Sequence, residues 1–96
     1  VKLDIGGKIF ATSVDNLLKI PQSYFGVMFS GQWKLKKTEE GTYYIDRQPL
    51  VFDHILDYLM TYPATYRCGL AKNDPLYHKL IADAEFYCLD HLRACL

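Results

Sequence analysis

The chain has 96 residues, of which half are hydrophobic, and eleven basic residues balance eleven acidic ones. This length suits one domain, residues 1–96, with a real core. The absence of net charge argues against nucleic acid or an anionic membrane surface as the main partner. No apolar run approaches the ~20 residues that cross a bilayer, so we expect a soluble piece without direct membrane contact, although it could be cut from a membrane protein. Specific protein contacts fit this composition better.

The cysteines give an indication of the cellular compartment. Cys68, Cys88 and Cys95 are odd in number and irregularly spaced. This pattern is more typical of reduced thiols in a cytosolic protein than of a disulfide framework. We therefore expect a cytoplasmic protein.

The first eleven residues predict a β-hairpin. Two alternating runs, 2–5 and 8–11, meet at Gly6 and Gly7, and glycine accepts the positive φ angles of a tight reversal. The alternation predicts one covered face, made by Leu3, Ile5, Ile9 and Ala11.

Two short helices should follow the hairpin. Thr12 or Ser13 can cap a helix over 14–19, which ends because Pro21 disfavours helical backbone at the residue before it. A second helix should start at Gln22 or Ser23.

This second helix covers 24–29, and Gly31 is its expected stop. Residues 32–41 are mostly polar and predict a solvated loop. The β-forming residues of 42–46 then predict a third strand.

The second half of the chain predicts three more helices. Pro49 suits the first position of a helix over 50–61, and Asp74 and Pro75 suit the start of another over 75–88. We expect residues 90–96 to begin a last helix that is truncated. In the helix over 50–61, the apolar positions predict a core stripe of Phe52, Ile55, Leu56 and Leu59.

Little in the sequence indicates chemistry. Cys88, His91 and Cys95 could share a helical face and hold zinc with Cys68, but no Cys-x-x-Cys pair fixes the geometry. We therefore expect that the protein is not an enzyme and that it has no catalytic residue, no metal ligand and no cofactor. Asp46-Arg47 follows the third strand, and two roles stay open for this pair: orienting the turn, or meeting a neighbouring subunit.

Taken together, the motifs resemble a known family: the potassium-channel tetramerisation type of BTB/POZ domain, which also occurs in soluble KCTD-like proteins. The resemblance covers nearly the whole chain, and it is specific because the pieces occur in the family's order and spacing. The matching positions are 3–13 (LDIGGKIFATS), 17, 20–25 (IPQSYF), 28–31 (MFSG), 41–49 (GTYYIDRQP), 52, 55–59 (ILDYL) and 84–89 (AEFYCL).

The resemblance implies an α+β fold: a three-stranded sheet with an opening β-hairpin, covered by about five helices. It also implies a ring of four or five copies, assembled through largely polar surfaces. Charged residues on or beside the predicted strands could meet between copies. The predicted oligomer interface is Lys2, Asp4, Lys8, Asp46 and Arg47.

Soluble relatives often bind the cullin-3 scaffold of a ubiquitin ligase and recruit its substrates, and we expect this function here. The alternative is the cytoplasmic tetramerisation domain of a voltage-gated potassium channel. Aromatic anchors are enriched at binding hot spots. The predicted partner-binding residues are Tyr24, Phe29, Trp33, Tyr58, Tyr62 and Tyr66, whereas Phe25, Tyr44, Phe52 and Phe86 are expected inside.

Overall fold

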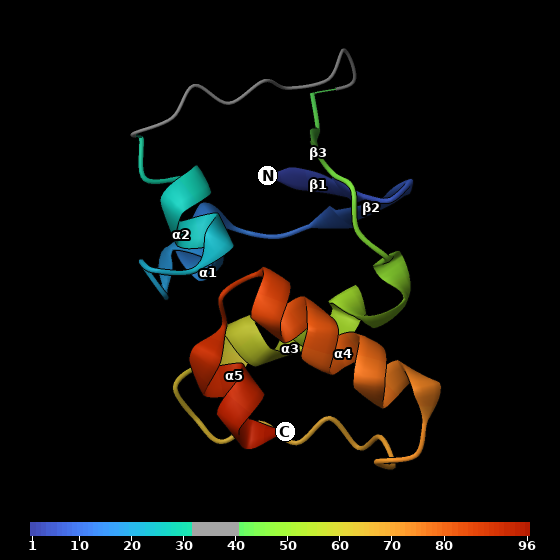
Figure 1. The fold of residues 1–96 in the computed structure, drawn as a ribbon. Helices are drawn as coiled ribbons and strands as arrows, with labels where there is room; N and C mark the ends of the chain where they lie inside the picture. The colour runs from blue at the N-terminus through green and yellow to red at the C-terminus, as the bar shows by residue number, and fades with distance from the viewer. Residues whose placement is uncertain (32–40) are drawn as a thin grey trace.

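The computed structural model describes residues 1–31 and 41–96, which form a three-stranded mixed sheet and five α-helices. This arrangement confirms the α+β fold class. The elements, in chain order, are β1 (Lys2–Ile5), β2 (Lys8–Ala11), α1 (Val14–Leu18), α2 (Tyr24–Met28), β3 (Tyr43–Ile45), the 3₁₀ turn η1 (Pro49–Val51), α3 (Phe52–Thr61), α4 (Pro75–Phe86) and α5 (Asp90–Cys95). Figure 1 shows the sheet with α1 and α2 in its upper half and the cluster of α3, α4 and α5 in its lower half.

The sheet has the order β2-β1-β3, with β1 antiparallel to β2 and parallel to β3. The predicted hairpin turn is confirmed, because Gly6 and Gly7 have φ angles of 58° and 104°. A Cβ atom on Gly6 would collide with the carbonyl oxygen of Arg47. Glycine therefore lets the hairpin lie directly against the segment that leaves β3.

The prediction of which β2 residues face the core is wrong. In β2, Phe10 is buried and Ile9 is 49% exposed, whereas the alternation placed Ile9 and Ala11 inside. The register explains the difference, because Phe10 lies opposite Leu3 and Ile9 lies opposite Asp4. Residues directly opposite in an antiparallel pair share a face, so the two-residue turn sets which residues of β2 face the core.

Serine caps fix the starts of α1 and α2. The Ser13 hydroxyl accepts a hydrogen bond from the backbone N–H of Asn16, and the Ser23 hydroxyl accepts one from Gly26, both at 3.1 Å. The backbone N–H of Tyr24 also donates to the carbonyl oxygen of Tyr87 at 2.8 Å. This last bond joins the start of α2 to the end of α4.

The core lies between the inner face of the sheet and the helices. Phe25 and Phe52 are fully buried, as predicted, but Tyr44 and Phe86 are 52% and 39% exposed, which corrects their expected place inside. Pro49 opens the 3₁₀ turn η1, and α3 begins at Phe52. The other large side chains with no exposed surface are Leu3, Ile5, Leu17, Ile55, Tyr58, Leu59, Leu80, Tyr87, Leu89 and Leu92.

Helix α4 starts as predicted and ends earlier than predicted. The Asp74 side chain accepts a hydrogen bond from the Leu76 N–H at 2.9 Å. At the other end, the N–H of Cys88 donates to Glu85 and that of Leu89 donates to Ala84, which is a Schellman motif. Cys88 therefore adopts the left-handed conformation with φ of 56° and is exposed.

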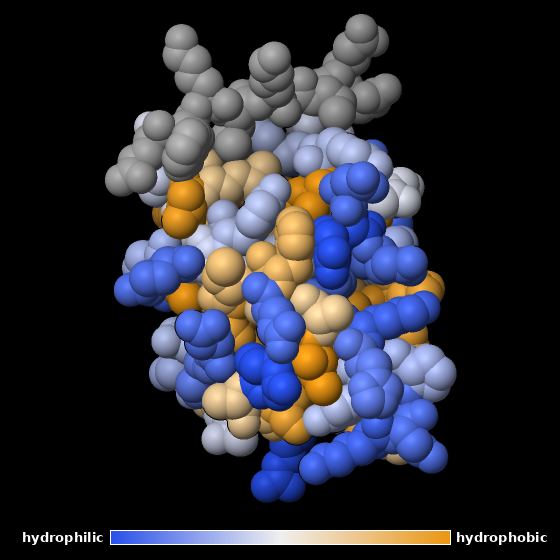
Figure 2. Space-filling view, viewed as in Figure 1, coloured by the Kyte–Doolittle hydropathy of each residue, from blue (hydrophilic) through white to orange (hydrophobic). Residues whose placement is uncertain are grey.

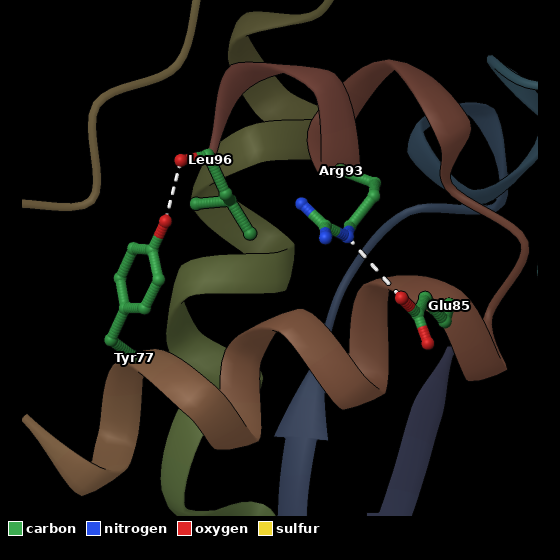
Figure 3. A network of polar contacts seen from close by, with 4 residues as sticks. All are labelled: Tyr77, Glu85, Arg93 and Leu96. Carbon is green, nitrogen blue, oxygen red and sulfur yellow. Dashed lines mark hydrogen bonds and ion pairs between the residues drawn. The ribbon is translucent and has the colours of Figure 1, made fainter. Parts of the chain in front are cut away.

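Two polar contacts join the last part of the chain to α4 (Figure 3). The Tyr77 hydroxyl donates to the carbonyl oxygen of Leu96 at 2.5 Å, and the Arg93 Nε donates to a Glu85 carboxylate oxygen at 3.2 Å. Arg93 and Glu85 both have side chains that are largely open to solvent. The ion pair is thus a surface pair, while Tyr77 is mostly buried.

Candidate interaction surface

The outward-facing residues of the sheet form the first candidate surface. Register and burial place Lys2, Asp4, Ile9, Ala11 and Tyr44 on the side opposite the core, and Asp46 continues this alternation beyond β3. We call these six residues the outer sheet face. The Tyr44 hydroxyl donates to an Asp46 carboxylate oxygen at 3.3 Å, which confirms that these two side chains lie on one side.

The five predicted interface residues divide between the two sides of the sheet. Lys2, Asp4 and Asp46 lie on the outer sheet face, whereas Lys8 and Arg47 fall on the inner side. The ammonium of Lys8 lies 5.0 Å from the centre of the Phe10 ring. The structure thus brings three of the five together and separates the other two.

Arg47 uses its charge within its own chain. Its guanidinium forms an ion pair with Asp83 of α4 and lies 4.4 Å from the centre of the Phe86 ring. Asp83 is 3% exposed, so the pair ties the end of β3 to the buried side of α4. Asp83 was not among the predicted site residues, although a carboxylate three residues after Leu80 on an apolar helical stripe is a recognisable signal.

Three buried polar atoms, two of them in this ion pair and one on Tyr87, have no hydrogen bond of their own among residues 1–31 and 41–96. These atoms are Arg47 Nε, Asp83 Oδ2 and the Tyr87 hydroxyl. The Nε atom lies on the same edge of the guanidinium as the Nη2 atom that contacts Asp83 Oδ1, but no hydrogen bond joins Nε to Oδ2, so the contact has one arm of the two that a bidentate pair would have. Burial, with a smaller effect from Asp83, raises the pKa of Tyr87 far above its usual value.

A shallow pocket of about 550 Å³ lies where the hairpin turn, the end of β3 and α4 meet. Gly6 and Tyr44 line it on the sheet side, and Lys79 and Asp83 line it on α4. Negative charge gathers at the sheet side of the pocket. The carboxylate of Asp46 makes the largest contribution to raising the pKa of Tyr44 above its usual value, and burial and Asp4 contribute less. The pocket is open, which suits protein contact better than catalysis.

The predicted partner-binding aromatic residues also divide. Tyr24 is 36% exposed, while Tyr62 and Phe29 are half-buried. Tyr58 and Tyr66 are buried, which corrects their expected place on a binding surface. Trp33 lies outside the described residues.

Hydrogen bonds to histidines explain why these two tyrosines lie inside. The Tyr58 hydroxyl lies 2.9 Å from Nδ1 of His91 in α5, and the Tyr66 hydroxyl lies 3.1 Å from Nδ1 of His54 in α3. Burial raises the pKa of Tyr66 to about 12. A tyrosine whose hydroxyl finds such a partner can be buried at little cost.

A second candidate surface lies where α2 meets the end of α4. Tyr24, Val27 and Phe86 are each between 36% and 39% exposed, and the Tyr24 and Phe86 rings are 5.2 Å apart. Val27 is one helical turn after Tyr24 and shares its face. We call these three residues the aromatic patch. More generally, hydrophobic side chains run down the middle of the face shown in Figure 2, between hydrophilic ones.

The described residues contain no group of three or more histidine, cysteine or acidic side chains placed to hold a metal ion. The three cysteines are free. Within residues 1–31 and 41–96, no helix combines the length and hydropathy needed to span a membrane.

Comparison with known proteins places this architecture in a family. A family model described as a BTB/POZ domain matches residues 1–95. The BTB/POZ domain-containing protein KCTD21 of Mus musculus is 41% identical over 61 residues, which are 64% of this chain and 24% of that protein. SH3KBP1-binding protein 1 of Bos taurus is 44% identical over 92 residues, or 96% of this chain and 12% of that protein.

A third relative carries a different name. The potassium channel regulatory protein of Mus musculus is 34% identical over 92 residues, which are 96% of this chain and 33% of that protein. The chain therefore spans a third or less of the length of each of these relatives. The family match, the KCTD-named relative and the observed mixed sheet agree: the chain belongs to the KCTD-like BTB/POZ family, whose domains serve oligomerisation and protein interaction.

Proposed function

We propose that this chain is the self-associating module of a soluble KCTD-like adaptor that recruits substrates to a cullin-3 ubiquitin ligase in the cytoplasm. The outer sheet face carries the first half of this proposal. It exposes Lys2 and Asp46, of opposite charge, with Asp4 between them on the central strand. Opposite charges on one face favour specific contact between identical chains, which can meet without charge repulsion.

The aromatic patch supports the second half. Tyr24 and Phe86 present large rigid rings beside each other, and such side chains supply most of the binding energy at interfaces. The patch belongs to α2 and α4, whereas the outer sheet face belongs to the strands. One chain can therefore hold its own copies and a cullin at the same time.

Light scattering of the purified domain at micromolar concentration tests self-association, and we expect a species of four or five copies. Titration with the amino-terminal domain of cullin-3 then tests the adaptor role by calorimetry. A monomer that ignores cullin-3 contradicts the proposal. A closed oligomer that ignores cullin-3 favours the alternative, the tetramerisation domain of a voltage-gated potassium channel, which the name of the potassium channel regulatory protein brings into consideration.

A matched pair of variants locates the cullin contact. Val27→Asp introduces a charge into the aromatic patch, at a side chain that is 39% exposed. Val14→Asp makes the same change at a side chain that is 41% exposed on α1. We expect Val27→Asp to weaken cullin-3 binding at least tenfold and Val14→Asp to leave it within twofold of the parent. Equal effects of the two changes would contradict a contact at the patch.

A further inference from the structure

The outer sheet face contains two large apolar side chains that the charge pattern alone does not explain. Ile9 is 49% exposed and Tyr44 is 52% exposed, both on strands whose opposite side forms the core. Scattered exposed apolar residues are ordinary on protein surfaces. These two are not scattered, because Asp4 pairs with Ile9 on one side and with Tyr44 on the other.

The register therefore builds one row across all three strands: Ile9, Asp4, Tyr44. Neighbouring strands lie about 4.8 Å apart, so the row spans roughly 10 Å. Asp4 is held in place, because its Oδ1 atom accepts a hydrogen bond from the Gly7 N–H at 2.8 Å. The row is thus a preformed strip in which a fixed carboxylate lies between two apolar groups.

The charges around this row indicate what it binds. Asp46 adjoins Tyr44, and together with Asp4 it makes this end of the face negative, as the raised pKa of Tyr44 reflects. Lys2 lies on the same face at the start of β1 and is exposed. The face therefore carries positive charge at one end and negative charge at the other. Every copy of the chain carries both charges, so neighbouring copies can complement both ends of this face, whereas a strongly acidic or basic partner would match only one end.

We propose that Ile9 and Tyr44 are the apolar anchors by which one copy of this chain binds the next, with Lys2 and the acidic pair Asp4 and Asp46 orienting the contact. The inference rests on the self-association proposed above and assigns it two residues that are neither charged nor part of the core. Desolvated apolar anchors with a polar surround are the usual arrangement of an interface.

The test replaces the anchors without changing charge or strand propensity. Ile9→Thr and Tyr44→Thr place threonine, a residue that is itself enriched in strands, at each position, and both positions are about half exposed in the single chain. The matched controls are Leu50→Thr and Met60→Thr, which remove apolar side chains that are 56% and 63% exposed elsewhere. Sedimentation velocity at about 1 to 100 μM, which covers dissociation constants in the micromolar range, measures the assembly of each protein.

We expect the Ile9→Thr/Tyr44→Thr double variant to raise the dissociation constant of the oligomer at least about 30-fold, with circular dichroism unchanged. The controls should stay within threefold of the parent. If the double variant assembles as strongly as the parent, the assignment of Ile9 and Tyr44 as anchors is overturned while self-association stands. An equal weakening of assembly in the control variants would also overturn this assignment. A monomeric parent chain would instead overturn the self-association itself.

Discussion

Removing the two partners of the Arg47–Asp83 ion pair should have unequal costs. Asp83 is 3% exposed, whereas the Arg47 side chain is 31% exposed. Arg47→Met leaves a buried carboxylate without its cation, a situation that costs about 3–5 kcal/mol. Asp83→Ala leaves an arginine that can turn toward water, so only a charged hydrogen bond is lost, which costs about 1.5–3 kcal/mol. We therefore expect Arg47→Met to lower the free energy of unfolding more.

A double variant distinguishes the cost of the unpaired buried carboxylate from the cost of losing the arginine side chain. Arg47→Met/Asp83→Ala removes the stranded charge, so its free energy of unfolding should lie above that of Arg47→Met alone. Arg93→Met is the matched control, because Arg93 pairs with Glu85 of the same helix α4 while both side chains are largely exposed. An exposed pair contributes about 0–1 kcal/mol, so this variant should change little.

Urea unfolding followed by far-UV circular dichroism measures all four variants at one protein concentration, since self-association would add a concentration-dependent term. A loss in Asp83→Ala that equals or exceeds the loss in Arg47→Met would refute the reasoning. The same holds if Arg93→Met costs as much as Arg47→Met. Either result would mean that burial of the carboxylate does not determine the cost.

Three further predictions concern stability. Cys88→Gly should raise the free energy of unfolding by about 1 kcal/mol, because the residue has a φ of 56° where glycine avoids the left-handed penalty; a lower urea midpoint would contradict this. Gly26→Ala should lower it, although alanine improves helix propensity by about 1 kcal/mol, because a Cβ would collide with carbonyl oxygens of the preceding turn; a higher melting temperature would contradict this. Burial raises the pKa of Tyr66 to about 12 and those of Tyr58 and Tyr87 further above the usual value of 10. Their neutral forms favour the folded state, so melting temperatures should be insensitive to these groups below about pH 10 and fall as pH rises to 12 and beyond; a flat profile between pH 10 and 12 would refute this.

The sequence predicted best those features that depend on local chemistry. The Gly6-Gly7 turn, the Ser13 and Ser23 caps and the start of α4 at Asp74 each involve a side chain or φ angle within three residues of the feature itself. Such signals do not depend on the rest of the fold. The end of α4 was less visible, because Cys88 holds a position that glycine usually marks.

Features that depend on distant contacts were predicted less well. The alternation of β2 is equally regular for either choice of inner face, and the register with β1 alone decides that Phe10 faces the core. The inward positions of Tyr58 and Tyr66 depend on His91 and His54, which are 33 and 12 residues away. The spacing of aromatic residues in the sequence does not show which distant side chain will form a hydrogen bond with a tyrosine hydroxyl.

Asp46 and Arg47 divide the two roles that the sequence left open for this dipeptide: Arg47 is observed to orient the turn, and contact with a neighbouring subunit is proposed for Asp46. Alternation beyond β3 sends Asp46 outward beside Tyr44 and sends Arg47 inward to Asp83. Arg47 thereby orients the turn, since it fixes the end of β3 against α4. Because that backbone is fixed, the carboxylate of Asp46 keeps its place on the outer sheet face. Loss of Arg47 should therefore weaken self-association as well as folding, although the proposed contact does not include its side chain.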